Sequence, residues 1–152
     1  MTEDAFDELC EVNLKAAMFL GQAVARHQVA AGGGRHVHVL SVRAHLGLRD
    51  RGYSAYCSTK GAMVMLVRQH AMELARHRIT VNGVAPTVVR SAMASHWLDN
   101  PVTHKQIVDR IPLGRVADPE DVVGPTLLFC CPAGEFVTGQ ILYIDGGITA
   151  SQ

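Results

Sequence analysis

The sequence lacks features that would each point to a particular class of protein. No apolar run approaches the roughly 18 residues of a membrane span, and the acidic, amphipathic first segment differs from secretory signals and transit peptides. Fourteen basic residues balance fourteen acidic ones, so charge gives no reason to expect binding to nucleic acid or a membrane surface. We therefore expect a cytoplasmic protein with no nucleic-acid partner and no membrane partner.

Cysteine and histidine are not spaced as metal ligands. The cysteines are Cys10, Cys57, Cys130 and Cys131, and the adjacent pair does not match the C-x-x-C spacing of a zinc site. The eight histidines are scattered along the chain. We expect no metal site, and free thiols of the kind found in a reducing compartment.

A glycine-rich phosphate-binding turn is also missing. In dinucleotide-binding folds the motif G-x-G-x-x-G follows the first strand and holds the pyrophosphate at a helix N-terminus, but no such motif occurs here. Gly32, Gly33 and Gly34 form a run that precedes a predicted strand instead of following one. We interpret this run as a helix stop and a turn.

What the sequence does contain is an alternation of helices and short strands over 152 residues, which fits a single domain, 1–152. Apolar periodicity predicts one helix that starts after Thr2 and ends before the glycine run, and a second over 53–76. Shorter helices are expected at 91–100, 103–111 and 119–130, and strands at 35–41, 79–85 and 141–144. This order implies a parallel sheet with right-handed crossovers. Its first strand is expected to have an open edge.

Tyr56 and Lys60 form the most informative pair. Four residues apart on a helix, they share one face. A phenol with a pKa of ~10 is a poor acid–base catalyst at neutral pH, and a nearby ammonium is expected to lower that pKa. By itself, such a pair more often means a core tyrosine and a solvated lysine. Lys60, however, lies on the apolar stripe, where an ammonium needs a partner.

Further segments agree with this pair. A strand ends at Ser41, a loop ends at 52–55, and the segments 79–86, 137–140 and 144–147 follow in order. Together they resemble the short-chain dehydrogenase/reductase family over nearly the whole chain. The resemblance implies an α/β fold, the C-terminal part of a Rossmann-like doubly wound parallel sheet with about three strands and flanking helices. It also implies that the family's N-terminal half, with its glycine-rich turn, is absent.

The resemblance implies roles for four residues. Tyr56 would be the general acid/base, and Lys60 would lower its pKa and bind the nicotinamide ribose. Ser41 would hydrogen-bond the substrate oxygen, and Asn13 would position a water next to the lysine. Ser41 lies fifteen residues before Tyr56, where the family more often has about thirteen, the position of Arg43. The alternatives are that Ser41 only ends a strand and that Asn13 is a satisfied core amide.

The resemblance also implies a site for NAD or NADP. Besides Tyr56 and Lys60, its contacts would come from the segment after the second strand, namely Pro86, Thr87, Val89 and Ser91. The family commonly has glycine and threonine where this chain has Thr87 and Ser91. The segment 93–111 would form a mobile substrate lid. Within it His96 and Trp97 are candidate contacts, although Trp97 serves equally well as a packing residue.

Two functions follow from these expectations. The first is an NAD(P)-dependent oxidoreductase that interconverts a small-molecule alcohol and a carbonyl by hydride transfer. The alternative is a truncated, inactive half-domain that acts, if at all, through association with a partner; the missing glycine motif favours it, and the complete set of four site residues opposes it. A second apolar face on both long helices predicts a homo-oligomer contact. Its residues are Ala16, Phe19, Ala23, Met65, Leu66 and Met72.

Overall fold

The computed structural model describes residues 1–49 and 52–150, and its centre is a three-stranded parallel sheet. The strands are β1 (Gly34–Val39), β2 (Ile79–Pro86) and β3 (Ile141–Ile144), in the order β1-β2-β3. Gly34 pairs with Ile79 at the start of one ladder, and Gly83 pairs with Ile141 at the start of the other. The expected parallel α/β fold is confirmed.

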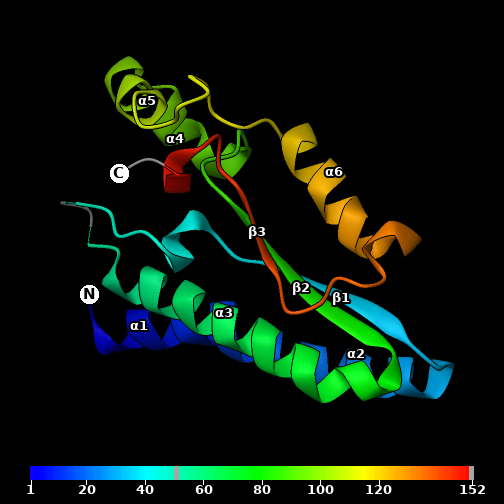
Figure 1. Ribbon diagram of the computed structural model, residues 1–152. Helices are drawn as coiled ribbons and strands as arrows, with labels where there is room; N and C mark the ends of the chain where they lie inside the picture. Colours follow the sequence, from blue (N-terminus) through cyan, green and yellow to red (C-terminus); the bar gives the residue numbers. More distant parts are fainter. Residues whose placement is uncertain (50–51, 151–152) are drawn as a thin grey trace.

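Helices cover both faces of the sheet (Figure 1). The long helices α2 (Ala16–Ala31) and α3 (Ser54–Leu74) lie side by side on one face, and α6 (Pro119–Cys130) lies on the other. The main core forms where α3 packs on the sheet. Its buried residues are Leu40, Met63, Val67, Ala71, Ile79, Val81 and Ala85.

The first predicted helix is continuous but not uniform. Thr2 caps α1 (Glu3–Cys10) by accepting the N–H of Ala5 at 3.3 Å, as the sequence suggested. A π-helical turn over Glu11–Lys15 then joins α1 to α2, and apolar periodicity had not predicted it. The glycine run ends α2 as expected, because Gly32 adopts a left-handed conformation with φ 86°.

The other boundaries differ modestly from the predictions. The β1 ladder stops at Val39, because Ser41 turns the chain into a 3-10 turn over Val42–Ala44. The helix expected at 91–100 is instead a 3-10 turn over Ala92–Ala94 followed by the short α4 (Ser95–Leu98). The helix α5 (Pro101–Val108) begins two residues earlier than predicted. Asn100 caps it by accepting the N–H groups of Val102 and Thr103.

A second, smaller core lies at the carboxyl ends of the strands. It is built by α4, α5 and the last loop, and its buried residues are Ala94, Leu98, Ile111, Val116 and Ile148. Figure 1 shows α4 and α5 at the same end of the sheet as the beginning of α3. This end therefore gathers the segments that carry the predicted site residues.

The sheet has an open edge at β1, as expected, because β1 pairs only with β2 among the described strands. Val39 at its end is 60% exposed. No helix in the described ranges is long and apolar enough to cross a membrane.

Candidate active site

Ser41 lies two residues after the end of β1, where it starts a tight turn. Its Oγ accepts the backbone N–H of Arg43 at 3.2 Å, which caps the 3-10 turn. The hydroxyl keeps its own O–H, which can still donate. Ser41 therefore caps the turn and retains an O–H donor for a second partner.

Tyr56 lies in the first turns of α3, half-buried and hydrogen-bonded to Ser41. Burial raises the pKa of the Tyr56 phenol above its ordinary value, and the Ser41 hydrogen bond partly opposes that rise. The expectation of a lowered pKa is therefore wrong for this chain. The loss of hydration of the phenolate outweighs the groups that stabilise it.

Lys60 has a partner, as its place on the apolar stripe suggested. Its Nζ donates to the carbonyl oxygen of Val39 at 3.1 Å and lies 5.7 Å from the centroid of the Tyr56 ring. Burial lowers the pKa of Lys60 below its ordinary value. The ammonium thus faces the ring of Tyr56, while one of its three protons is held by the end of β1.

Asn13 is connected to the same helix through Thr59. The Asn13 amide Nδ2 donates to Thr59 Oγ1 at 3.2 Å, and that hydroxyl donates to the Tyr56 carbonyl oxygen at 2.9 Å. Thr59 is only 2% exposed. The amide nitrogen of Asn13 therefore has a partner within the chain, and this bond holds the π-helical turn against α3.

The segment after β2 lies at the same end of the sheet, next to the end of β3. The Thr87 N–H donates to the Ile144 carbonyl oxygen at 3.1 Å, and Val89 forms a parallel bridge with Ala117. Ser91 Oγ accepts the N–H of Ala94 at 3.3 Å. Thr87 does not need the conformational freedom of glycine, because Arg78 is the one non-glycine residue with positive φ in the described ranges.

The predicted lid contains one packed aromatic residue and one exposed end. Trp97 is half-buried against the smaller core, and the ring of His96 lies 4.1 Å from it. Met93 is 81% exposed. Trp97 therefore contributes to the packing of this segment.

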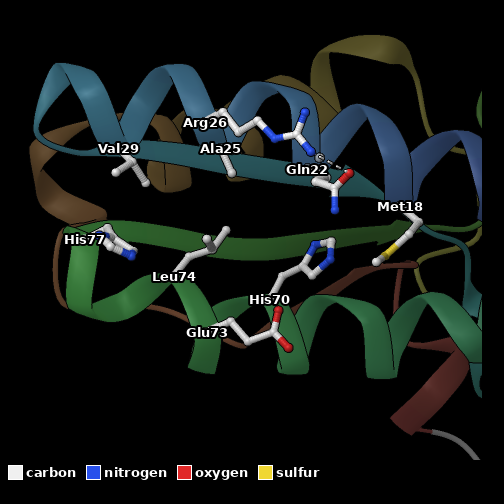
Figure 2. Close-up of a pocket in the computed structure, with 10 residues that line it drawn as sticks. Met18, Gln22, Ala25, Arg26, Val29, His70, Glu73, Leu74 and His77 are labelled. Carbon is white, nitrogen blue, oxygen red and sulfur yellow. Dashed lines mark hydrogen bonds between the residues drawn. The ribbon is translucent and has the colours of Figure 1, made fainter.

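Two hollows border the α2–α3 layer. One of about 390 Å³ runs along the open edge of β1 and reaches Asn13, Lys60 and Val39. The other, of about 410 Å³, lies between α2 and α3 and does not include any of the four predicted site residues (Figure 2). There Met18, Gln22 and His70 point toward one another across the two helices. Of the four predicted site residues, the first hollow is lined by Asn13 and Lys60, and the second is a feature of the helix faces.

The structure gathers Ser41, Tyr56 and Lys60 at one place and joins Asn13 to them through Thr59. Sequence reasoning missed Thr59, although it lies inside the Tyr-x-x-x-Lys segment with a side chain that can bond in two directions. It also considered Arg43 only as the residue at the position where the family more often has its serine. Among the described residues, no three His, Cys, Asp or Glu side chains are grouped to hold a metal ion.

Comparison with known proteins gives consistent matches. A family model described as Enoyl-(Acyl carrier protein) reductase matches residues 1–149. The chain is 42% identical over 149 residues to L-xylulose reductase of Mesocricetus auratus, covering 97% of this chain and 60% of that protein. It is 36% identical over 146 residues to gluconate 5-dehydrogenase of Gluconobacter oxydans, covering 96% of this chain and 56% of that protein.

A crystal structure of a gluconate 5-dehydrogenase from Burkholderia cenocepacia, in complex with NADP and tartrate, has the same fold. It superposes with a TM-score of 0.94 at 31% identity, over 100% of this chain and 59% of that one. The chain thus spans about 60% of the length of these relatives.

Proposed function

The chain belongs to the short-chain dehydrogenase/reductase family, and we propose that the protein is an NAD(P)-dependent oxidoreductase that interconverts an alcohol and a carbonyl. The observation that carries the proposal is the hydrogen bond between Ser41 and Tyr56 beside the Lys60 ammonium. Relatives named as L-xylulose reductase and gluconate 5-dehydrogenase support the reaction class. The proposal concerns the whole protein's activity.

In this proposal Tyr56 moves the proton. Its raised pKa keeps the phenol protonated at neutral pH, which is the form that protonates a carbonyl oxygen during reduction. The Ser41 hydroxyl donates to the same oxygen and stabilises the charge that develops there. Lys60 holds positive charge against the Tyr56 ring, which favours the phenolate left after proton transfer.

The residues present fit one end of a nicotinamide cofactor. Lys60 keeps two N–H donors beyond its bond to Val39, and the exposed Ser91 hydroxyl keeps its O–H. With Tyr56 they would hold the nicotinamide side, and Pro86, Thr87 and Val89 would line it. When bound, NAD or NADP supplies the hydride. The NADP complex of the similar gluconate 5-dehydrogenase supports this assignment.

The test is a Tyr56→Phe substitution in a chimaera that carries the N-terminal portion of a matched relative ahead of Met1. We expect turnover to fall by at least ~100-fold, the scale of general acid–base catalysis, with little change in cofactor affinity. Tyr53→Phe is the matched control, because its ring lies 5.8 Å from that of Tyr56 on the same helix turn. Full activity of Tyr56→Phe would remove Tyr56 from the mechanism.

We also propose that α2 and α3 form a homo-oligomer contact. Phe19, Met65 and Met72 are 57%, 58% and 78% exposed, which is unusual for large apolar side chains on two adjacent helices. Ala16 and Ala23 are exposed on α2 as well. Leu66 was expected in this contact, but it is half-buried and packs against the main core of its own chain. It is therefore excluded from the proposed contact.

A second candidate function is that this chain acts only with a polypeptide that covers β1. The observation that favours it is the set of exposed apolar side chains at the hollow along that strand, where Val12, Leu20 and Val39 are 66%, 66% and 60% exposed. An uncovered strand edge of this kind is one that natural proteins normally protect.

Free thiols at all four cysteines support a reducing compartment, and we propose that the protein is located in the cytoplasm.

A further inference from the structure

Three hydrogen-bonding groups follow one another from the π-helical turn to α3. The Thr59 hydroxyl donates to the Tyr56 carbonyl oxygen at 2.9 Å, and its Oγ1 lies 3.2 Å from Nδ2 of Asn13. Thr59 is only 2% exposed, so both bonds are shielded from bulk water. These contacts fix the direction in which each proton is donated.

That direction is set at Tyr56. A carbonyl oxygen can only accept, so the single proton of the Thr59 hydroxyl is used there. Oγ1 can then only accept from Asn13, which an amide satisfies with its Nδ2 and not with its oxygen. A reversed amide would place Oδ1 against Oγ1, two buried acceptors with no proton between them, and such a contact is destabilising.

The oxygen of the Asn13 amide is left for another partner. Asn13 is half-buried, and the hydrogen bonds within residues 1–49 and 52–150 include no donor to its Oδ1. Asn13 and Lys60 line the same hollow of about 390 Å³, and Lys60 keeps two N–H donors beyond its bond to Val39. A polar hollow of that size also has room for water.

We propose that Thr59 is a positioning residue, which orients the Asn13 amide so that its oxygen faces the hollow and accepts from Lys60, directly or through one water. The opposite orientation would turn two N–H donors toward an ammonium that itself only donates. This inference deepens the proposed function, and its meaning for the reaction rests on that function. An acceptor at this place keeps Lys60 charged beside the Tyr56 ring.

The other ionisable groups that face Lys60 do not supply such an acceptor. Burial lowers the pKa of Lys60, and the side chains that line its hollow in the described ranges include no carboxylate. Burial also lowers the pKa values of His36 and His38, so both are neutral above pH 7, and Arg35 stays charged throughout. The phenol of Tyr56 has a raised pKa and contributes no negative charge at neutral pH.

The test is the titration of Lys60 in the 152-residue chain, followed by NMR of lysine labelled with ¹³C at Cε. The chain has three lysines, so Lys15 and Lys105 serve as internal references. Thr59→Val keeps the shape of the side chain and removes its hydroxyl, and we expect the midpoint of the Lys60 titration to fall by about half a pH unit to one unit. Thr59→Ser keeps the hydroxyl and should restore the midpoint.

Ser58→Ala is the matched control. Ser58 Oγ also donates to a carbonyl oxygen of α3, that of Ser54 at 2.8 Å, but Ser58 is exposed. Its replacement should leave the Lys60 midpoint unchanged. Asn13→Ala removes the acceptor itself, should lower the midpoint as much as Thr59→Val does, and decides the question if Thr59→Val fails to fold. The double variant should go no lower, because both changes act through one group.

The outcomes separate this inference from the proposed function. A lowered midpoint confined to Lys60 in Thr59→Val supports the inference. An unchanged midpoint in Thr59→Val or in Asn13→Ala, or a lowered one in Thr59→Ser, would overturn it even if turnover depends on Tyr56. If Tyr56→Phe keeps full activity in the chimaera while the Lys60 midpoint depends on Thr59, the proposed mechanism fails and the orientation of Asn13 stands.

Discussion

Single residues in this site are governed by opposing effects of similar size. Tyr56 gains a hydrogen bond from Ser41 and loses hydration, and burial prevails, so its pKa rises. Lys60 is subject to the same loss of hydration, and its pKa falls. The phenol and the ammonium are therefore each shifted toward the neutral form. The raised pKa makes loss of the phenol proton costlier, whereas the lowered pKa makes loss of a proton from Lys60 easier.

Two histidines on β1, His36 and His38, and His70 on α3 make stability depend on pH. Burial, together with His36 and His70, lowers the pKa of His38 to about 4. Ring nitrogens of all three residues are buried without a hydrogen-bond partner among the described groups. The unfolded chain therefore takes up a proton at His38 near pH 6.5, before the folded chain does. The stability linked to His38 is complete above about pH 6.5 and is lost as the pH falls toward 4.

We predict that the free energy of unfolding falls by about 1–2 kcal/mol through His38 between pH 7.5 and pH 5. Urea denaturation at the two pH values measures it. His38→Gln keeps a polar side chain of similar reach without the titration, so its midpoint should change less over the same interval. Parallel losses in the two proteins would show that other groups account for the pH dependence.

At the scale of elements, the connection between the π-helical turn and α3 explains how two helices distant in sequence share one site. Thr59 accepts from Asn13 and donates to the Tyr56 carbonyl oxygen, so a single buried hydroxyl fixes the turn relative to the tyrosine's helix. The Lys60 bond to the end of β1 then fixes α3 relative to the sheet. The geometry of the candidate site thus depends on contacts between elements and not on α3 alone.

The exposed faces of α2 and α3 give a prediction at the same scale. Phe19→Asp should yield a smaller species by light scattering, because a buried carboxylate in an apolar helix contact lacks compensation. Phe136→Asp is the matched control, since Phe136 is fully exposed and belongs to neither helix, coming after α6 in the sequence. The proposed contact is excluded if the unmodified chain is monomeric or if both variants behave alike.

For the whole molecule, the proposed function assigns the groups assembled here to the nicotinamide side of a cofactor only. A pyrophosphate turn would add several charge-assisted hydrogen bonds, each worth about 1.5–3 kcal/mol. Two such bonds correspond to about a hundredfold or more in affinity. We predict that residues 1–152 alone bind NAD or NADP no better than about millimolar and show no dehydrogenase activity.

Titration calorimetry and a nicotinamide absorbance assay measure the two parts of this prediction. The chimaera with a relative's N-terminal portion is the positive control, and it should recover both binding and turnover. Micromolar binding by the 152-residue chain would contradict the prediction and would mean that the described groups suffice.

The sequence by itself determined the elements and the chemistry that they carry. Strand β3 was predicted with its observed bounds, and Tyr56 and Lys60 were placed on one helix face, because periodicity and spacing are local properties of the chain. The turn at the glycine run followed from the same kind of information, since left-handed backbone favours glycine.

Only the tertiary structure decided the sign of the Tyr56 pKa shift, the partner of Asn13 and the partial burial of Leu66. Each depends on what surrounds a side chain, and those surroundings come from segments far away in the sequence. Loss of hydration and the distance between charges are properties of that packing. A local pattern names the groups, but the folded environment sets their pKa values and their partners.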